Sequence, residues 1–172
     1  MVPHPYHNQN YIFNHVGVSV PDVDKAAEWY SKHFGFRRIK PDNDVDGAEN
    51  PVALAHMSKL FGNKLRKVKM VFLSTGNSVG FELFEFIDPP VKQPDMEKWT
   101  LEEQYQRGGV FHFCLTVPEP QAVCDAVCKD GAAQIGETIQ GYDGEGGLYL
   151  RDPWGNVIEL LSCNFEQLLA NR

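Results

Sequence analysis

The sequence contains no apolar run of about 18 residues, the length that a membrane-spanning helix needs, so we expect no membrane span. Its first residues, MVPHPYHNQNYIF, lack the basic and then apolar order of a secretory signal. Only four of the 172 residues are cysteines and none form a Cys-x-x-Cys pair, which argues against a disulfide scaffold. Together these absences favour a cytoplasmic protein whose cysteines stay reduced.

Positive charge is also scarce, since 16 Lys and Arg residues face 23 Asp and Glu residues and leave a formal net charge of -7. The largest basic cluster, KLRKVK at 64–69, is short and local. A nucleic-acid partner is therefore not expected, because such proteins carry an extended basic surface. Apolar residues (42%) and charged residues (23%) occur in the proportions of an ordinary globular chain.

One pattern occurs twice along the chain. Phe13–Phe36 reads FNHVGVSVPDVDKAAEWYSKHFGF and Phe111–Ala133 reads FHFCLTVPEPQAVCDAVCKDGAA. Each copy opens with an apolar strand that carries a His, His15 or His112, and reaches Val-Pro-acid five residues after it. A helical pattern follows in both copies. Chance similarity is the alternative, but the matching order and offsets favour a duplication.

Local signals place the helix ends within this repeat. Asp22 is a suitable N-cap, and apolar residues follow it at helical spacing. Gly35 and Gly131 suit the left-handed position just beyond a helix end. Both copies then continue as strand, Gly-Asn turn and strand with Glu-Leu, in KVKMVFLSTGNSVGFELFEF and GLYLRDPWGNVIELLSC. The module is therefore a strand, a helix and two or three further strands.

The repeat also sets the expected boundaries of the domain. Between the copies, a segment rich in Pro and charge reads as a linker, with a short helix around 95–106. The insertion in the first copy contains ENPVALAHMSKLFG, a short amphipathic helix that could be a lid or a dimer contact. We predict an N-terminal arm (1–12), a first module (13–87, insertion 40–66), a linker (88–109), a second module (110–164) and a tail (165–172).

Four ionisable residues occupy matched places in otherwise apolar strands: His15, Glu82, His112 and Glu159. Burying a lone carboxylate costs several kcal/mol unless a partner compensates it, so a shared divalent cation explains the set. Two imidazoles and two carboxylates without thiolate suit Fe, Mn, Ni, Co or Zn, with positions left for substrate oxygens. Glu85 is the rival to Glu82, on the opposite face of its strand.

The chain resembles the vicinal oxygen chelate superfamily of glyoxalases, bleomycin-resistance proteins and dioxygenases. The motifs that carry the resemblance are NHVGVSVPDVDKAAEWYSKHFGF, GFELFEF, FHFCLTV and DPWGNVIEL. It implies an α+β fold in which two βαβββ modules form an open, cup-shaped mixed β-sheet with flanking helices, over about 12–164. The His, Glu, His, Glu order of glyoxalase I-like members maps onto His15, Glu82, His112 and Glu159.

The resemblance also implies a class of reaction. It predicts a metal-dependent isomerase, epimerase or lyase in which Glu82 or Glu159 removes a proton beside a carbonyl and the ion stabilises the enolate or oxyanion. The alternatives are an Fe(II) oxygenase with three protein ligands, a glyoxalase I and a metal-free binding protein. Glyoxalase I is disfavoured because Ser19 and Phe86 stand where bacterial sequences tend to place Arg and Asn.

Aromatic residues near the predicted site favour a small, rather apolar substrate, although any single Phe could equally be a core residue. An exposed sheet edge favours a homodimer, with the modules paired within the chain or across the dimer. The predicted substrate-binding residues are Ser19, Phe84, Phe86, Cys114 and Trp154.

Overall fold

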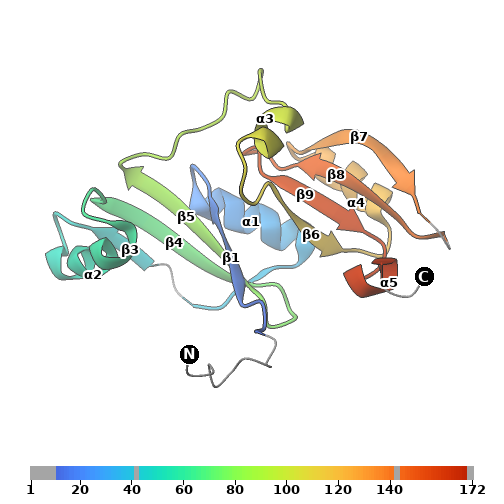
Figure 1. The fold of residues 1–172 in the computed structure, drawn as a ribbon. Coiled ribbons are helices and arrows are strands. Elements are labelled where there is room, and N and C mark those ends of the chain that lie inside the picture. The colour runs from blue at the N-terminus through green and yellow to red at the C-terminus, as the bar shows by residue number, and fades with distance from the viewer. Residues whose placement is uncertain (1–10, 41–42, 142–143, 170–172) are drawn as a thin grey trace, which may run out of the picture. The chain divides into compact units, whose positions relative to one another are not determined.

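The computed structural model describes residues 11–40, 43–141 and 144–169 (Figure 1). The chain divides into two compact units, Met1–Val91 and Lys92–Arg172. The division falls inside the predicted linker 88–109. Most of the predicted N-terminal arm and the last three residues of the predicted tail lie outside the described residues.

The first unit is built on a five-stranded mixed sheet with the order β1-β5-β4-β2, in which β3 also pairs with β4. β1 runs parallel to β5, and the other pairs are antiparallel. Helix α1 packs against β4 and β5 (Figure 1). The strands are β1 (His15–Ser19), β2 (Arg37–Arg38), β3 (Asn43–Asp46), β4 (Lys67–Ser74) and β5 (Gly80–Asp88).

The second unit repeats this arrangement with four strands in the order β6-β9-β8-β7. β6 runs parallel to β9, and the remaining pairs are antiparallel. Helix α4 packs against β7 and β8 (Figure 1). The strands are β6 (His112–Thr116), β7 (Ala133–Gln140), β8 (Gly146–Arg151) and β9 (Val157–Leu161).

The two sheets agree in register as well as in order. Gly17 lies opposite Glu82 in the β1–β5 pair, and Cys114 lies opposite Glu159 in the β6–β9 pair. The two copies of the sequence repeat therefore place their Glu-Leu glutamates in the same strand register relative to the His of each copy. The α+β class and the duplicated βαβββ module are confirmed.

Helix α1 (Val23–Phe34) forms where the sequence predicts it. The Asp22 carboxylate accepts a hydrogen bond from the Lys25 amide at 3.1 Å, and Gly35 ends the helix in the left-handed conformation with φ 69°. Tyr30 on its buried face contacts the rings of Phe36 and Phe81. Both predicted ends of this helix are correct.

Helix α4 (Pro120–Cys128) ends earlier than predicted. Lys129, in right-handed conformation, caps it, so Gly131 is not the residue just beyond the helix. Gly131 nevertheless has φ 90°, and a Cβ there would lie 3.3 Å from Pro153 Cγ. A glycine at position 131 therefore permits both a tight turn and a close approach to the β8–β9 connection.

The insertion contributes more than a helix to the first unit. α2 (Pro51–Phe61) begins at Asn50, whose side chain accepts from the Ala53 amide at 3.0 Å. β3, which the sequence did not predict, adds an edge strand to the sheet. Val45 of β3 joins Leu65, Val68 and Met70 in a buried cluster onto which residues of α2 pack. The insertion is an integral part of this unit's core.

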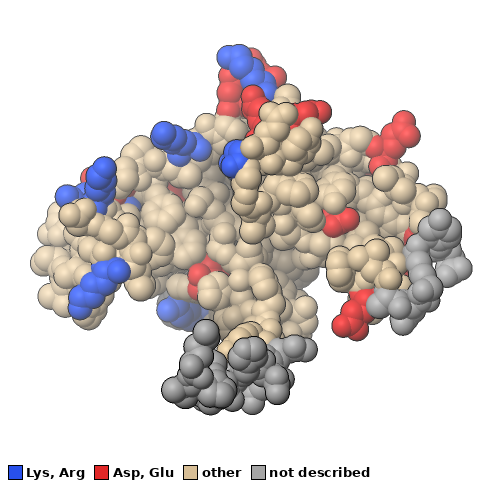
Figure 2. Space-filling view, in the orientation of Figure 1, with Lys and Arg blue, Asp and Glu red and all other residues tan. Residues whose placement is uncertain are grey.

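Two short helices lie in the second unit. α3 (Leu101–Gln106) covers only the second half of the predicted helix at 95–106, because Thr100 provides its N-cap. α5 (Phe165–Leu169) follows the last strand. None of the helices in the described residues is both long and apolar enough to cross a membrane. On the face shown in Figure 2, Lys and Arg side chains lie in small separate groups.

Candidate metal-binding pairs

His15 and Glu82 meet within the first unit. Because Gly17 is the register partner of Glu82, His15 lies diagonally across the parallel β1–β5 pair from that carboxylate. The His15 Nε2 and Glu82 Oε2 atoms are 3.6 Å apart, and the two side chains are 48% and 25% exposed. The pair is therefore close, accessible and free of a direct hydrogen bond at that distance.

Asn14 lies against the ring of its neighbour His15. The His15 Nδ1 atom lies 2.7 Å from the Asn14 side-chain oxygen, which can only accept, so Nδ1 carries the hydrogen of this contact. In the neutral ring the Nε2 lone pair then faces the Glu82 carboxylate. Two such acceptors need a proton or a metal ion between them, and an imidazole oriented in this way is a typical metal ligand.

His112 and Glu159 form the equivalent pair in the second unit. The His112 Nε2 and Glu159 Oε2 atoms are 3.2 Å apart, and the two side chains are 27% and 20% exposed. His112 is also packed edge-on against the Tyr149 ring, with centroids 5.3 Å apart. The second pair is thus tighter and less exposed than the first.

The outer nitrogen of His112 differs from that of His15. His112 Nδ1 is buried and has no hydrogen-bond partner among the described residues. A buried polar atom without a partner costs about 1–3 kcal/mol. Only the first of the two imidazoles therefore has the hydrogen-bonded support that usually orients a metal ligand.

The surroundings of the two glutamates are not alike. Tyr149 is the register partner of Glu159 on β8, whereas Phe72 is the register partner of Glu82 on β4. The pKa of the Tyr149 hydroxyl is raised to about 12, mainly by burial and secondly by the charge of Glu159. The same causes in the same order raise the pKa of the Cys114 thiol to about 12.

Tyr149 and Cys114 are thus the polar register partners of Glu159. Tyr149 and Phe72 were not among the predicted site residues, although each lies ten residues before its glutamate. Aligning the two copies at Glu-Leu would have identified both.

Glu85, the rival to Glu82, faces the other way. Its carboxylate accepts a hydrogen bond from the Val23 amide at 3.2 Å, at the beginning of α1. A negative charge there also suits the positive end of the helix dipole. Glu85 therefore belongs to the helix-covered face of the sheet, and Glu82 belongs to the opposite face.

The residues predicted to bind substrate lie in three places. Ser19 ends β1, where it is the register partner of Phe84 on β5. Phe84 and Phe86 are stacked, with centroids 5.7 Å apart. Cys114 is the register partner of Glu159.

Trp154 lies apart from these strands, in the β8–β9 turn, where its amide donates to the buried Asp152 carboxylate at 2.9 Å. A substrate role for these five residues stays a prediction.

The donor atoms of both pairs suit a divalent ion. Each pair offers one imidazole nitrogen and one carboxylate oxygen, the ligands that Zn, Fe, Mn, Co and Ni accept. Within either unit, the described residues contain no group of three or more His, Cys, Asp or Glu side chains that could hold a metal ion. The union of the two pairs around one ion is part of the proposal below.

The duplicated βαβββ module defines the fold class of this chain. The chain belongs to the Glyoxalase/Bleomycin resistance protein/Dioxygenase superfamily, whose family model matches residues 12–160. The superfamily includes metal-dependent enzymes such as glyoxalase I. A comparison with curated protein sequences finds no match.

Solved structures share this fold at low sequence identity. A glyoxalase family protein from Bacillus cereus is 20% identical with a TM-score of 0.68, covering 90% of this chain and 95% of that one. The trypanothione-dependent glyoxalase I of Leishmania major is 18% identical with a TM-score of 0.56, at 88% and 86% coverage. A glyoxalase I variant from Zea mays is 16% identical with a TM-score of 0.57, at 88% and 45% coverage. At these identities the likeness concerns the fold alone.

Proposed function

We propose that this protein is a divalent-metal-dependent isomerase, epimerase or lyase that acts on a small oxygenated, rather apolar molecule. His15, Glu82, His112 and Glu159 would hold one ion. The observation that supports this most is the repetition of one geometry, since each module aims a histidine Nε2 at a glutamate oxygen across the same register. The Asn14 contact at Nδ1 also supports the proposal, because it leaves Nε2 of the neutral His15 ring available to an ion beside Glu82.

When bound, a divalent ion supplies a Lewis acid that stabilises the negative charge developing on a carbonyl oxygen. The chain itself supplies the base, and we assign that role to Glu82. In this proposal Glu159 is restrained by its polar register partners Tyr149 and Cys114, whereas Phe72 and Gly17 occupy the matching places beside Glu82 and have no polar side chain. Glu82 is thus free to move and take a proton from the carbon beside a substrate carbonyl.

Ion binding by purified variants tests the ligand set. The metal-free protein is titrated with Zn²⁺, Mn²⁺, Co²⁺ and Ni²⁺, and we expect one ion per chain. Glu159→Gln should weaken binding more than Glu82→Gln, because the restrained carboxylate holds the ion throughout. Glu85→Gln is the matched control on the other face of β5 and should bind as the parent does. Unchanged affinity in both Glu82→Gln and Glu159→Gln would refute the ligand assignment.

Turnover separates the proposed chemistry from the alternatives. On a panel of hydroxy- and oxo-compounds, the proposal expects solvent deuterium to enter the carbon beside a carbonyl, and Glu82→Gln to abolish this exchange. Oxygen uptake with a catechol-like substrate would instead show an Fe(II) oxygenase. A glutathione adduct as the preferred substrate would show a glyoxalase I. Tight ligand binding without any ion would show a binding protein of the bleomycin-resistance type.

We also propose that the protein is a cytoplasmic homodimer. β1 and β6 each end their sheet in the described part of the chain, so each has one edge that can pair with another strand. Light scattering coupled to size exclusion should give twice the mass of one chain. A monomeric mass across a wide range of concentrations would contradict the dimer.

A further inference from the structure

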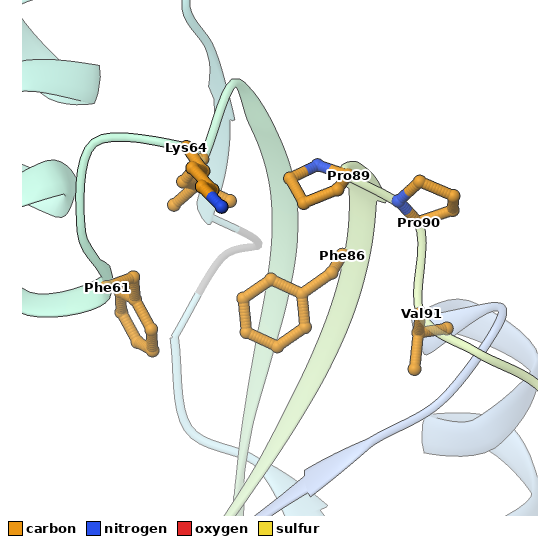
Figure 3. Close-up of a pocket in the computed structure, with 7 residues that line it drawn as sticks. Phe61, Lys64, Phe86, Pro89, Pro90 and Val91 are labelled. Carbon is orange, nitrogen blue, oxygen red and sulfur yellow. The ribbon is translucent and has the colours of Figure 1, made fainter.

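A cavity of about 320 Å³ lies in the first unit, between the end of α2 and the end of β5 (Figure 3). Its walls are almost entirely apolar, and Lys64 supplies their one charged group. Phe61 comes from α2, Phe86 from β5, and Pro89, Pro90 and Val91 from the segment that follows β5. The volume is at the lower end of the roughly 300–1,000 Å³ typical of small-ligand pockets, which suits one or two rings.

The cavity opens on the face of β5 that carries Glu82. Residues two apart on a strand share a face, so Glu82, Phe84 and Phe86 form one row. Phe84 covers Gly17 on the neighbouring β1, where an added Cβ would lie 3.3 Å from its ring. Four residues along a strand span about 13 Å, so an elongated molecule can reach from Glu82 to Phe86.

Three aromatic rings line the path from Glu82 to the cavity. The Phe84 and Phe86 rings are nearly parallel, with an interplanar angle of 8°, and the centroid of the Phe61 ring lies 5.7 Å from the centroid of each. Phe61 is 44% exposed, which leaves much of its surface open to a ligand. Flat aromatic or other apolar groups would bury this surface favourably.

Main-chain hydrogen bonds fix both sides of the cavity. The Arg66 guanidinium donates to the Asn63 and Leu65 carbonyl oxygens, at 2.6 and 2.8 Å. The Arg66 amide donates to the Asp88 carbonyl at 2.7 Å, and the Val91 amide donates to the Phe86 carbonyl at 3.0 Å. The loop that carries Lys64 is thus anchored to the end of β5, and the cavity is preformed.

Lys64 has a different role from its charged neighbours. The Arg66 guanidinium donates to a carbonyl oxygen of the loop, and the Lys67 ammonium forms an ion pair with Asp46 at 2.8 Å. None of the described acidic side chains forms an ion pair with Lys64. An ammonium at the rim of an apolar cavity matches a ligand that has an apolar body and an anionic group.

We propose that this cavity binds the distal part of the substrate, a flat apolar group of one or two rings that carries a carboxylate or similar anion for Lys64. The end of the substrate that reacts would lie at Glu82, and this second part rests on the proposed function. The insertion that forms α2 is then the element that sets substrate specificity. Phe86 has an apolar role here, in keeping with the absence of a polar group for glutathione at that position.

The binding test uses 2-naphthoate and its neutral isostere 2-naphthamide, titrated into the full chain with and without added metal. Metal-free protein should bind both, with 2-naphthoate several-fold tighter. Phe61→Ala should weaken both about tenfold, because it removes an aromatic wall of the cavity that is 44% exposed and not part of the buried core. Lys64→Gln should lower the affinity for 2-naphthoate about five- to tenfold and leave the affinity for 2-naphthamide unchanged. Lys64→Arg should keep the affinity of the parent for 2-naphthoate. Lys59→Gln, an exposed α2 residue outside the cavity, is the control.

The outcomes separate this proposal from the proposed function. Failure of both probes to bind, or equal effects of Lys64→Gln and Lys59→Gln, would overturn the cavity assignment while leaving ion binding untouched. If the parent protein binds 2-naphthoate but no divalent ion, the result would count against the metal site only. Thermal melting of each variant shows that it is folded before either comparison is made.

Discussion

The contact between Asn14 and His15 allows a sharp test of the first metal-binding pair. Replacing Asn14 by Ala removes the acceptor for His15 Nδ1, 2.7 Å away, without touching a proposed ligand. The imidazole then loses the partner that selects the tautomer with a free Nε2. We expect the affinity for a divalent ion to fall while the number of ions bound per chain at saturation stays the same.

The exposure of the His15 side chain determines how much ion affinity Asn14→Ala should lose. Loss of such outer hydrogen bonds typically lowers metal affinity 10- to 100-fold. The His15 side chain is 48% exposed, so water can partly replace the amide oxygen and the loss should be at the lower end, about tenfold. Competition with a chromophoric chelator measures the dissociation constant of Zn²⁺ or Co²⁺ for the parent and the variant.

Two matched variants complete this test. Asn14→Asp keeps an acceptor and adds charge, so it should retain or increase the affinity. Asn63→Ala removes an amide elsewhere in the same unit and should have no effect. If Asn14→Ala binds the ion as tightly as the parent does, the proposed orientation of His15 is wrong.

Three further predictions concern the scaffold. The fully buried Asp152 carboxylate accepts hydrogen bonds from the Trp154 amide and from both nitrogens of Asn156. Asp152→Ala should therefore lower the free energy of unfolding, measured in urea, by about 3 kcal/mol, and Asp152→Asn should lower it less. Burial first, and then the neighbouring Cys128, raise the pKa of Cys124 to about 12, so iodoacetamide at pH 8 should label Cys124 only after unfolding. The Lys25 amide lowers the pKa of the Asp22 carboxyl, so Asp22→Ala should cost about 1 kcal/mol at pH 7. This difference should begin to shrink near the ordinary value of 3.8 and continue to fall as the pH passes through the lowered pKa of the folded state. Equal stability of parent and Asp22→Ala at pH 7 would contradict the cap.

Much of the fold could be predicted because the sequence contains the same module twice. The offset from His15 to Val-Pro-acid recurs after His112, and both copies place the Glu of Glu-Leu on the strand next to the His. Strand alternation also separated Glu82 from Glu85, which contacts α1 in the structure. These are local, periodic signals that a single sequence carries.

The features that escaped prediction depend on contacts between distant segments. β3 is a strand because it pairs with β4, and nothing in its short polar sequence requires this. The helix before Gly131 ends at Cys128, and that glycine lies in a turn close to Pro153, which is distant in the sequence. The orientation of His15 depends on a side-chain rotamer of Asn14, and the cavity depends on how α2 returns to the end of β5. Periodicity reports none of these.

The claim that both modules serve one ion is tested most directly by counting ions in His15→Ala, His112→Ala and the parent. Equilibrium dialysis with Zn²⁺ at a concentration that just saturates the parent, followed by elemental analysis, gives the ratio of ion to chain. We predict one ion per chain in the parent and a large loss in each variant, because each removes one of four shared ligands. Two ions per parent chain, or a full complement retained by either variant, would contradict a shared site.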